Sequence, residues 1–176
     1  MINKKIEEAF NKQINEELFS FYLYLSIAAW FESINLKGFS HWMKTQAQEE
    51  MFHAMKFYNH IIDRGGSVAL ASIAEPKKKW DSAHNVFVES LAHEGHITAC
   101  INDLMDLALE EKDHAAQSLL RWFVDEQVEE EATFSEYVEK LKMIGDHNPL
   151  LLMQDKEMGL RPIGVNPFFS VAAEAQ

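Results

Sequence analysis

Six potential metal ligands form two sets of three with the same internal spacing. In each set the second residue follows the first by 33 positions, and the third follows the second by three. The two sets are Glu17, Glu50 and His53, and then Glu94, Gln127 and Glu130. Corresponding members lie 77 positions apart, so the chain carries a twofold internal repeat of polar residues.

Each of these residues interrupts an apolar stripe with helical spacing. Around Glu17, for example, Ile14, Phe21 and Tyr24 recur at intervals of three and four, which predicts a helix with that face buried. A lone carboxylate there would lose its hydration, whereas a cation shared by several carboxylates removes that cost. Oxygen donors with one imidazole suit iron or manganese better than the thiolate-rich sets of structural zinc sites. The spacing therefore predicts a metal site inside a helical bundle.

A solvated helix face is the alternative interpretation. An isolated E-x-x-H, such as Glu50 and His53, occurs often by chance, and glutamates on long helices usually face water. Here, however, four separate helical segments are interrupted at matching heights and with identical separations. This joint coincidence favours the metal site.

The periodic segments predict four long helices joined by two short turns and one long connection. They cover 6–33, 39–63, 82–111 and the stretch from the turn at 112–113 to about 144. A short fifth helix is expected over about 150–159, after the helix stop at Gly145 and Pro149. Short turns make each pair antiparallel, and the connection at 65–81 lets the second pair dock beside the first. The predicted fold is an all-α four-helix bundle over 1–159, with an unassigned tail at 160–176.

The composition is that of a globular protein without a nucleic-acid or membrane partner. Hydrophobic residues make up 47% of the 176 positions, enough for one domain with a substantial core. The formal charge of −12 argues against nucleic acid, because phosphate binding needs clustered Lys and Arg. No uncharged apolar run approaches the roughly 18–20 residues that cross a bilayer, and the first ten residues lack the apolar core of a secretion signal. Cys100 is the single cysteine, so no intramolecular disulfide can form, and we expect a cytoplasmic protein.

Three stretches resemble the bacterial non-haem ferritins of the ferritin-like di-iron superfamily. They are LFSFYLYLS, KGFSHWMKTQAQEEMFHAMKFY and LLRWFVDEQVEEEA, and the resemblance covers residues 1 to about 158. It implies a ferritin-like four-helix bundle with one long crossover and a short fifth helix. The fourth helix has Q-x-x-E where the symmetric di-iron pattern has a second E-x-x-H. That replacement is characteristic of non-haem ferritins and separates the chain from bacterioferritins.

The resemblance also implies how iron would be held. The ligands of a first iron would be Glu17, Glu50 and His53. Glu50 would bridge to a second iron, which would be surrounded by Glu94, Gln127 and Glu130. Gln127 is a neutral and weak ligand, so the second iron should be held more loosely, which is useful if iron must leave after oxidation.

A third iron site is implied by a further group of acidic residues. Its members would be Glu49, Glu126, Glu129 and Glu130. The alternative is an ordinary acidic surface, because 129–131 is a run of three glutamates.

The resemblance implies a functional role for Tyr24 and Trp122, each of which could instead be an ordinary core residue, and it raises the question of haem at Met51. Tyr24 lies seven positions after Glu17 and would hydrogen-bond a ligand or supply an electron, or else pack as an ordinary buried aromatic. Trp122 would be an electron donor or part of the core. Met51 follows Glu50 as the haem-binding methionine of bacterioferritins does, but without a second E-x-x-H we expect no haem.

The other histidines show no ligand spacing, and we expect surface roles for them. They are His41, His60, His84, His93, His96, His114 and His147.

The combined prediction is a ferroxidase that also stores iron. Two Fe(II) ions would enter the bundle, reduce dioxygen or hydrogen peroxide, and leave as Fe(III) that forms an oxyhydroxide mineral. By resemblance, about two dozen identical subunits would form a 24-subunit shell around that mineral. Two rivals are a rubrerythrin-like peroxidase, for which the C-x-x-C pairs are missing, and a structural bundle or storage shell without oxidation activity.

Overall fold

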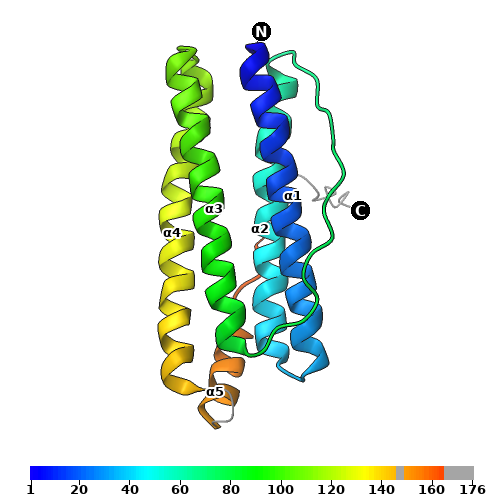
Figure 1. Ribbon diagram of the computed structural model, residues 1–176, viewed down its shortest axis with the longest axis vertical. Coiled ribbons are helices and arrows are strands. Elements are labelled where there is room, and N and C mark those ends of the chain that lie inside the picture. The colour runs from blue at the N-terminus through cyan, green and yellow to red at the C-terminus, as the bar shows by residue number, and fades with distance from the viewer. Residues whose placement is uncertain (146–148, 165–176) are drawn as a thin grey trace, which may run out of the picture.

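The computed structural model describes residues 1–145 and 149–164, and over these it contains five helices and no strand (Figure 1). The helices are α1 (Lys4–Ser33), α2 (Lys37–Asp63), α3 (Ala83–Glu110), α4 (His114–Ile144) and α5 (Pro149–Met158). The predicted all-α bundle is therefore confirmed, and every predicted boundary lies within two residues of the observed one. His147 and the apolar segment 167–169 of the tail lie outside the described residues.

Side-chain oxygens cap three of the four long helices at their N-termini. Asn3 accepts from the N–H of Lys5, Ser82 from Asn85 and Asp113 from Ala116. Each cap satisfies an N–H that has no partner within its own helix. The cap at Asn3 explains why α1 begins two residues earlier than its apolar period predicts.

The second helix is capped from a distant part of the chain. Its N-cap residue Leu36 makes no side-chain cap. Instead, the Asp155 carboxylate of α5 accepts from the N–H groups of Gly38 and Phe39, at 2.8 and 3.0 Å. This carboxylate adds a negative charge at the positive end of α2, where it is favourable. The end of the bundle is thus closed by α5, which packs against α2 and α4.

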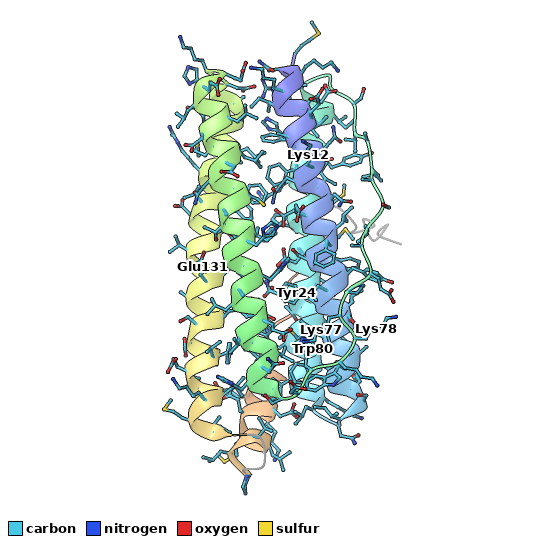
Figure 2. The ribbon with its side chains drawn as sticks, viewed as in Figure 1. Lys12, Tyr24, Lys77, Lys78, Trp80 and Glu131 are labelled. Atoms are coloured by element: carbon cyan, nitrogen blue, oxygen red, sulfur yellow. The ribbon has the colours of Figure 1, made fainter. Side chains whose placement is uncertain are left out.

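The long connection runs the length of α1, from the end of α2 to the start of α3 (Figure 1). It is fastened at both ends, because Asn11 donates to the carbonyl of Ser67 at 3.0 Å and Ser26 donates to the carbonyl of Lys77 at 2.6 Å. Lys77, Lys78 and Trp80 lie beside the lower half of α1 (Figure 2). The predicted crossover between two antiparallel helix pairs is therefore present.

Two apolar clusters fill the bundle, one on each side of a polar layer. One cluster includes Phe31, Phe39 and Phe134, and the other includes Phe10 and Phe57. Burying each such side chain stabilises the fold by about 1.5–3 kcal/mol. On every long helix the predicted ligand separates residues of one cluster from residues of the other. The cores therefore hold the polar layer in place. Of the helices that the structure describes, none combines the length and apolar character needed to cross a membrane.

Candidate metal centre

All four long helices send a polar side chain into the layer between the two apolar clusters. The six residues of the sequence repeat are all buried there, with Glu17 and Glu50 only 0% and 2% exposed. Glu17 comes from α1 and Glu94 from α3. The other helices supply two each, which are Glu50, His53, Gln127 and Glu130.

Glu17, Glu50 and His53 form the most compact set of donors. Nδ1 of His53 lies 3.3 Å from Oε2 of Glu50 and 3.9 Å from Oε2 of Glu17. One donor atom from each residue lies within 4.8 Å of the other two, and no other three His, Cys, Asp or Glu residues in 1–145 and 149–164 meet that condition. Metal–ligand distances near 2.0–2.2 Å place donors at about this separation.

The Oε2 atom of Glu17 supports a cation at this position. It is fully buried and has no hydrogen-bond partner. A buried carboxylate oxygen without a partner is costly, and a shared metal ion would satisfy it. The donor set, two carboxylates and one imidazole, fits iron by its chemistry.

The second half of the layer is built around Glu94. The Tyr24 hydroxyl donates to Oε1 of Glu94, and Figure 2 shows Tyr24 in the seam between α1 and α3. The Gln127 amide donates to Oε2 of Glu94 at 3.3 Å and lies equally close to the Thr98 hydroxyl. Thr98 in turn donates to Glu131 at 2.5 Å. Tyr24, expected to hydrogen-bond a ligand residue, and Gln127, expected beside Glu94, are both in direct contact with Glu94.

Two glutamines donate hydrogen bonds to carboxylates of the layer, and one of them bridges two carboxylates. Gln46 donates to Oε1 of Glu50 at 3.0 Å and to Oε1 of Glu130 at 2.9 Å, which ties α2 to α4. Gln13 donates to Oε1 of Glu17 at 2.9 Å. Sequence reasoning did not assign either glutamine to the site. The available signal was their position four residues before Glu17 and Glu50, where helical side chains meet.

Burial and the charge of Glu50 favour the protonated form of three carboxyl groups of the layer, Glu17, Glu94 and Glu130, by raising their pKa values. Burial raises the pKa of Glu17 to about 8, although the nearby His53 opposes the rise. Burial and the charge of Glu50 raise the pKa of Glu130 to about 8 and that of Glu94 well above its usual range. These groups must lose their protons before they can bind a metal ion as carboxylates.

His53 and Glu50 behave in the opposite way, as an ion pair. Burial alone would lower the pKa of His53, but the hydrogen bond to Glu50 and the charges of Glu50 and Glu17 raise it to about 10. Burial would raise the pKa of Glu50, yet the hydrogen bond and charge of His53 bring it below its ordinary value. The metal-free site therefore holds a protonated imidazole beside one ionised carboxylate.

The members of the implied third site are spread from buried to exposed positions. Glu49 is half-buried, and its Oε2 lies 2.5 Å from Nη2 of Arg161. Glu126 is half-buried and Glu129 is exposed, while Glu130 belongs to the buried layer. The third site stays a prediction. Arg161 lies in the tail at 160–176, for which the sequence predicts no structure. Its contact with Glu49 was therefore not predicted.

The remaining candidates lie around this layer. Trp122 meets the His53 ring edge-on at 5.5 Å, and Lys56 Nζ lies 3.9 Å above Trp122. His96 is exposed, as expected, and pairs with Glu16. His93 differs, because it is half-buried and its Nε2 lies 2.7 Å from the Ser20 hydroxyl.

The fold is a four-helix bundle whose buried polar layer gathers three potential metal ligands, Glu17, Glu50 and His53. A sequence model of the ferritin-like domain matches residues 7–144, so the chain belongs to the ferritin family. It is 38% identical to the bacterial non-heme ferritin of Staphylococcus aureus over 161 residues, which is 92% of this chain and 97% of that one.

Solved ferritin structures agree with this assignment. The open-pore ferritin of the archaeon Archaeoglobus fulgidus superposes with a TM-score of 0.90 at 48% identity, over 92% of this chain and 98% of that one. A closed form engineered from the same archaeal ferritin gives a TM-score of 0.91 at 48% identity, over 93% and 100% of the two chains. The resemblance to ferritins found in the sequence is confirmed.

Proposed function

We propose that this chain is the subunit of an iron-storage shell and that it oxidises Fe(II) to Fe(III) at its buried polar layer. The observation that carries the proposal is the Oε2 atom of Glu17, buried without a hydrogen-bond partner beside Glu50 and His53. Family membership supports iron as the substrate, because the similar proteins are ferritins.

In the proposed reaction, Glu17, Glu50 and His53 bind the first Fe(II). Glu50 extends to a second Fe(II) held by Glu94, with Gln127 and Glu130 beside it. Each iron gives up one electron, and dioxygen takes both electrons and two protons to leave as hydrogen peroxide, which can serve as oxidant in a later turnover. Glu17, Glu94 and Glu130 hold protons that iron binding releases. Neutral Gln127 leaves the second iron less tightly held, so that Fe(III) can depart.

Assembly into a shell of 24 subunits is part of the same proposal. The short helix α5 leaves Leu150, Leu152 and Met153 exposed, at 48%, 60% and 66%. Three large apolar side chains exposed on ten residues indicate a contact surface. Further copies of this chain are the partners that the ferritin relatives suggest.

Two variants and one matched control test the oxidation step. Glu17→Ala and His53→Ala each remove one donor of the compact set, and we expect the initial rate of aerobic Fe(II) oxidation to fall at least tenfold. Glu8→Ala, exposed on the same helix as Glu17, should keep the parental rate. If both site variants oxidise Fe(II) as fast as the parent, the chain forms a bundle or shell without ferroxidase activity.

The storage step needs a separate measurement. Size-exclusion chromatography with light scattering gives the particle mass, and iron analysis after aerobic Fe(II) addition gives the load per subunit. We expect a particle of about 24 subunits that holds far more than three irons per chain. A small particle that binds iron only at the buried centre, without a mineral, would favour a di-iron enzyme acting on another substrate.

A further inference from the structure

Arg161 is held on α2 by four contacts, although it lies beyond α5. Its Nη2 donates to Glu49 at 2.5 Å, and its Nη1 donates to Oε1 of Gln46 at 3.0 Å. The guanidinium lies 4.2 Å from the centroid of the Trp42 ring, and the backbone carbonyl lies 2.7 Å from Nε2 of His41. Figure 1 shows the segment after α5 turning back along α2.

These contacts place a fixed positive charge at the edge of the acidic layer. The side chain of Arg161 is only 21% exposed, and its planar guanidinium satisfies a carboxylate and an amide oxygen at once. Burial raises the pKa of Glu49, and Arg161 opposes that rise. The guanidinium thus occupies the place where a metal ion bound to Glu49 would put its charge.

A single residue, Gln46, connects Arg161 to the buried carboxylates by hydrogen bonds. Gln46 accepts from Arg161 with its oxygen and donates with its amide nitrogen to both Glu50 and Glu130. Arg161 therefore fixes the orientation of the Gln46 amide, because only one orientation serves all three partners. A change at Glu49 that moves Arg161 also removes the donor that holds the Gln46 oxygen.

We propose that Arg161 is a tethered counterion for the metal position at Glu49. While no metal is bound there, the guanidinium neutralises Glu49 and holds Gln46. A metal cation binds Glu49 only by displacing the guanidinium, so each departure of the cation is assisted by the return of Arg161. This inference rests on the proposed function, since it assumes that iron passes Glu49 next to the buried centre.

Metal titration of the assembled protein tests the competition. Zn(II), which is not oxidised, is titrated calorimetrically into the unaltered protein and into Arg161→Gln. The binding phase that Glu49→Gln removes is assigned to Glu49, and we expect Arg161→Gln to tighten that phase about three- to tenfold. Arg121→Gln removes an equal charge from an exposed position on α4 and is the matched control. Equal affinities at Glu49 for the parent and Arg161→Gln, or weaker binding in Arg161→Gln, would overturn the inference.

A second measurement uses the unaltered protein and does not depend on the folding of any variant. Crystals soaked in Zn(II) are examined for anomalous density at Glu49 and between Glu17, Glu50 and His53. An ion at Glu49 with the guanidinium withdrawn from it supports the proposal. Density at the buried centre alone, or an ion at Glu49 with Arg161 still bonded, rejects the counterion role and leaves the proposed function intact. A lack of density at both places counts against the proposed function itself.

Discussion

The hydroxyl of Tyr24 on α1 donates its hydrogen bond to the carboxylate of Glu94 on α3. This contact joins the two antiparallel helix pairs at the polar layer. Burial, together with the charge of Glu94, raises the pKa of Tyr24 well above its usual value, so the phenol remains a donor. Tyr24 also stacks on Phe134 of α4 with the ring centroids 5.8 Å apart. Its ring belongs to the core and its hydroxyl belongs to the site.

Replacing Tyr24 by Phe separates these two roles. The ring remains packed, so the free energy of unfolding should change by no more than about 0.5–1.5 kcal/mol, the net worth of one hydrogen bond. Glu94 loses a donor that orients it, so the proposed second metal position at Glu94 should lose affinity by about three- to tenfold. Anaerobic Fe(II) titration measures this loss. Tyr22→Phe, exposed on the same helix, is the control, and an equal effect of both variants would refute the role of the Tyr24 hydroxyl.

The raised pKa values of Glu17, Glu130 and His53 predict that the polar layer makes the metal-free protein less stable as the pH rises. Glu17 and Glu130 have folded-state pKa values of about 8 against 4.5, so the folded state keeps protons that the unfolded chain loses over that interval. His53, with a pKa of about 10 against 6.5, stabilises the folded state below 6.5 and loses this contribution as the pH rises through 10. All three changes have the same sign.

Thermal denaturation of the metal-free protein between pH 6 and pH 9 tests this trend. We expect the melting temperature to fall with pH, and to fall less steeply in Glu17→Gln, which carries no titrating proton at that position. Saturating Zn(II) should oppose the fall, because the metal binds the deprotonated ligands. A melting temperature of the metal-free protein that rises with pH would contradict the assigned pKa shifts.

Changing Gln127 to Glu tests why a neutral side chain stands beside Glu94. The variant places a second carboxylate 3.3 Å from the first, so we expect the metal-free protein to lose about 1–3 kcal/mol of stability. Metal should reverse the loss and should bind more tightly at Glu94, which would slow iron release to the mineral. Gln117→Glu introduces a carboxylate into α4 near the Ala108 carbonyl, away from the layer. The Gln117→Glu variant should lose stability that metal does not restore. If metal restored the stability of both variants equally, the result would argue against a metal position at Glu94.

The sequence predicted the residues of the buried polar layer because each one breaks an apolar period at a repeated spacing. Such a break is local information, and it located Glu17, Glu50 and Glu94 before any fold was known. The structure adds partners that local patterns do not specify. Arg161 reaches Glu49 across 112 positions, and its segment has no helical period. Contacts of this kind depend on where α5 docks, which the apolar spacing of the long helices does not determine.

The docking of α5 itself depends on Gly38, the second residue of α2. A Cβ atom at Gly38 would overlap the carbonyl oxygen of Asp155, while nothing lies within 4 Å of a Cβ atom added at Gly95, in the middle of α3. Gly38→Ala should therefore push α5 away, weaken the Asp155 cap and cost about 1–3 kcal/mol. Gly95→Ala should instead stabilise the protein by about 0.5–1 kcal/mol, because alanine loses less backbone entropy in a helix.

Thermal and chemical unfolding of both glycine variants in the metal-free state measures this difference. The same substitution should shift stability in opposite directions at the two positions, because only Gly38 is approached by another backbone. If Gly38→Ala were as stable as Gly95→Ala, α5 could not be seated against α2 as closely as these contacts require. Since Arg161 follows directly from α5, Gly38→Ala should also loosen the pairing of Arg161 with Glu49, and so give the tighter Zn(II) binding expected for Arg161→Gln.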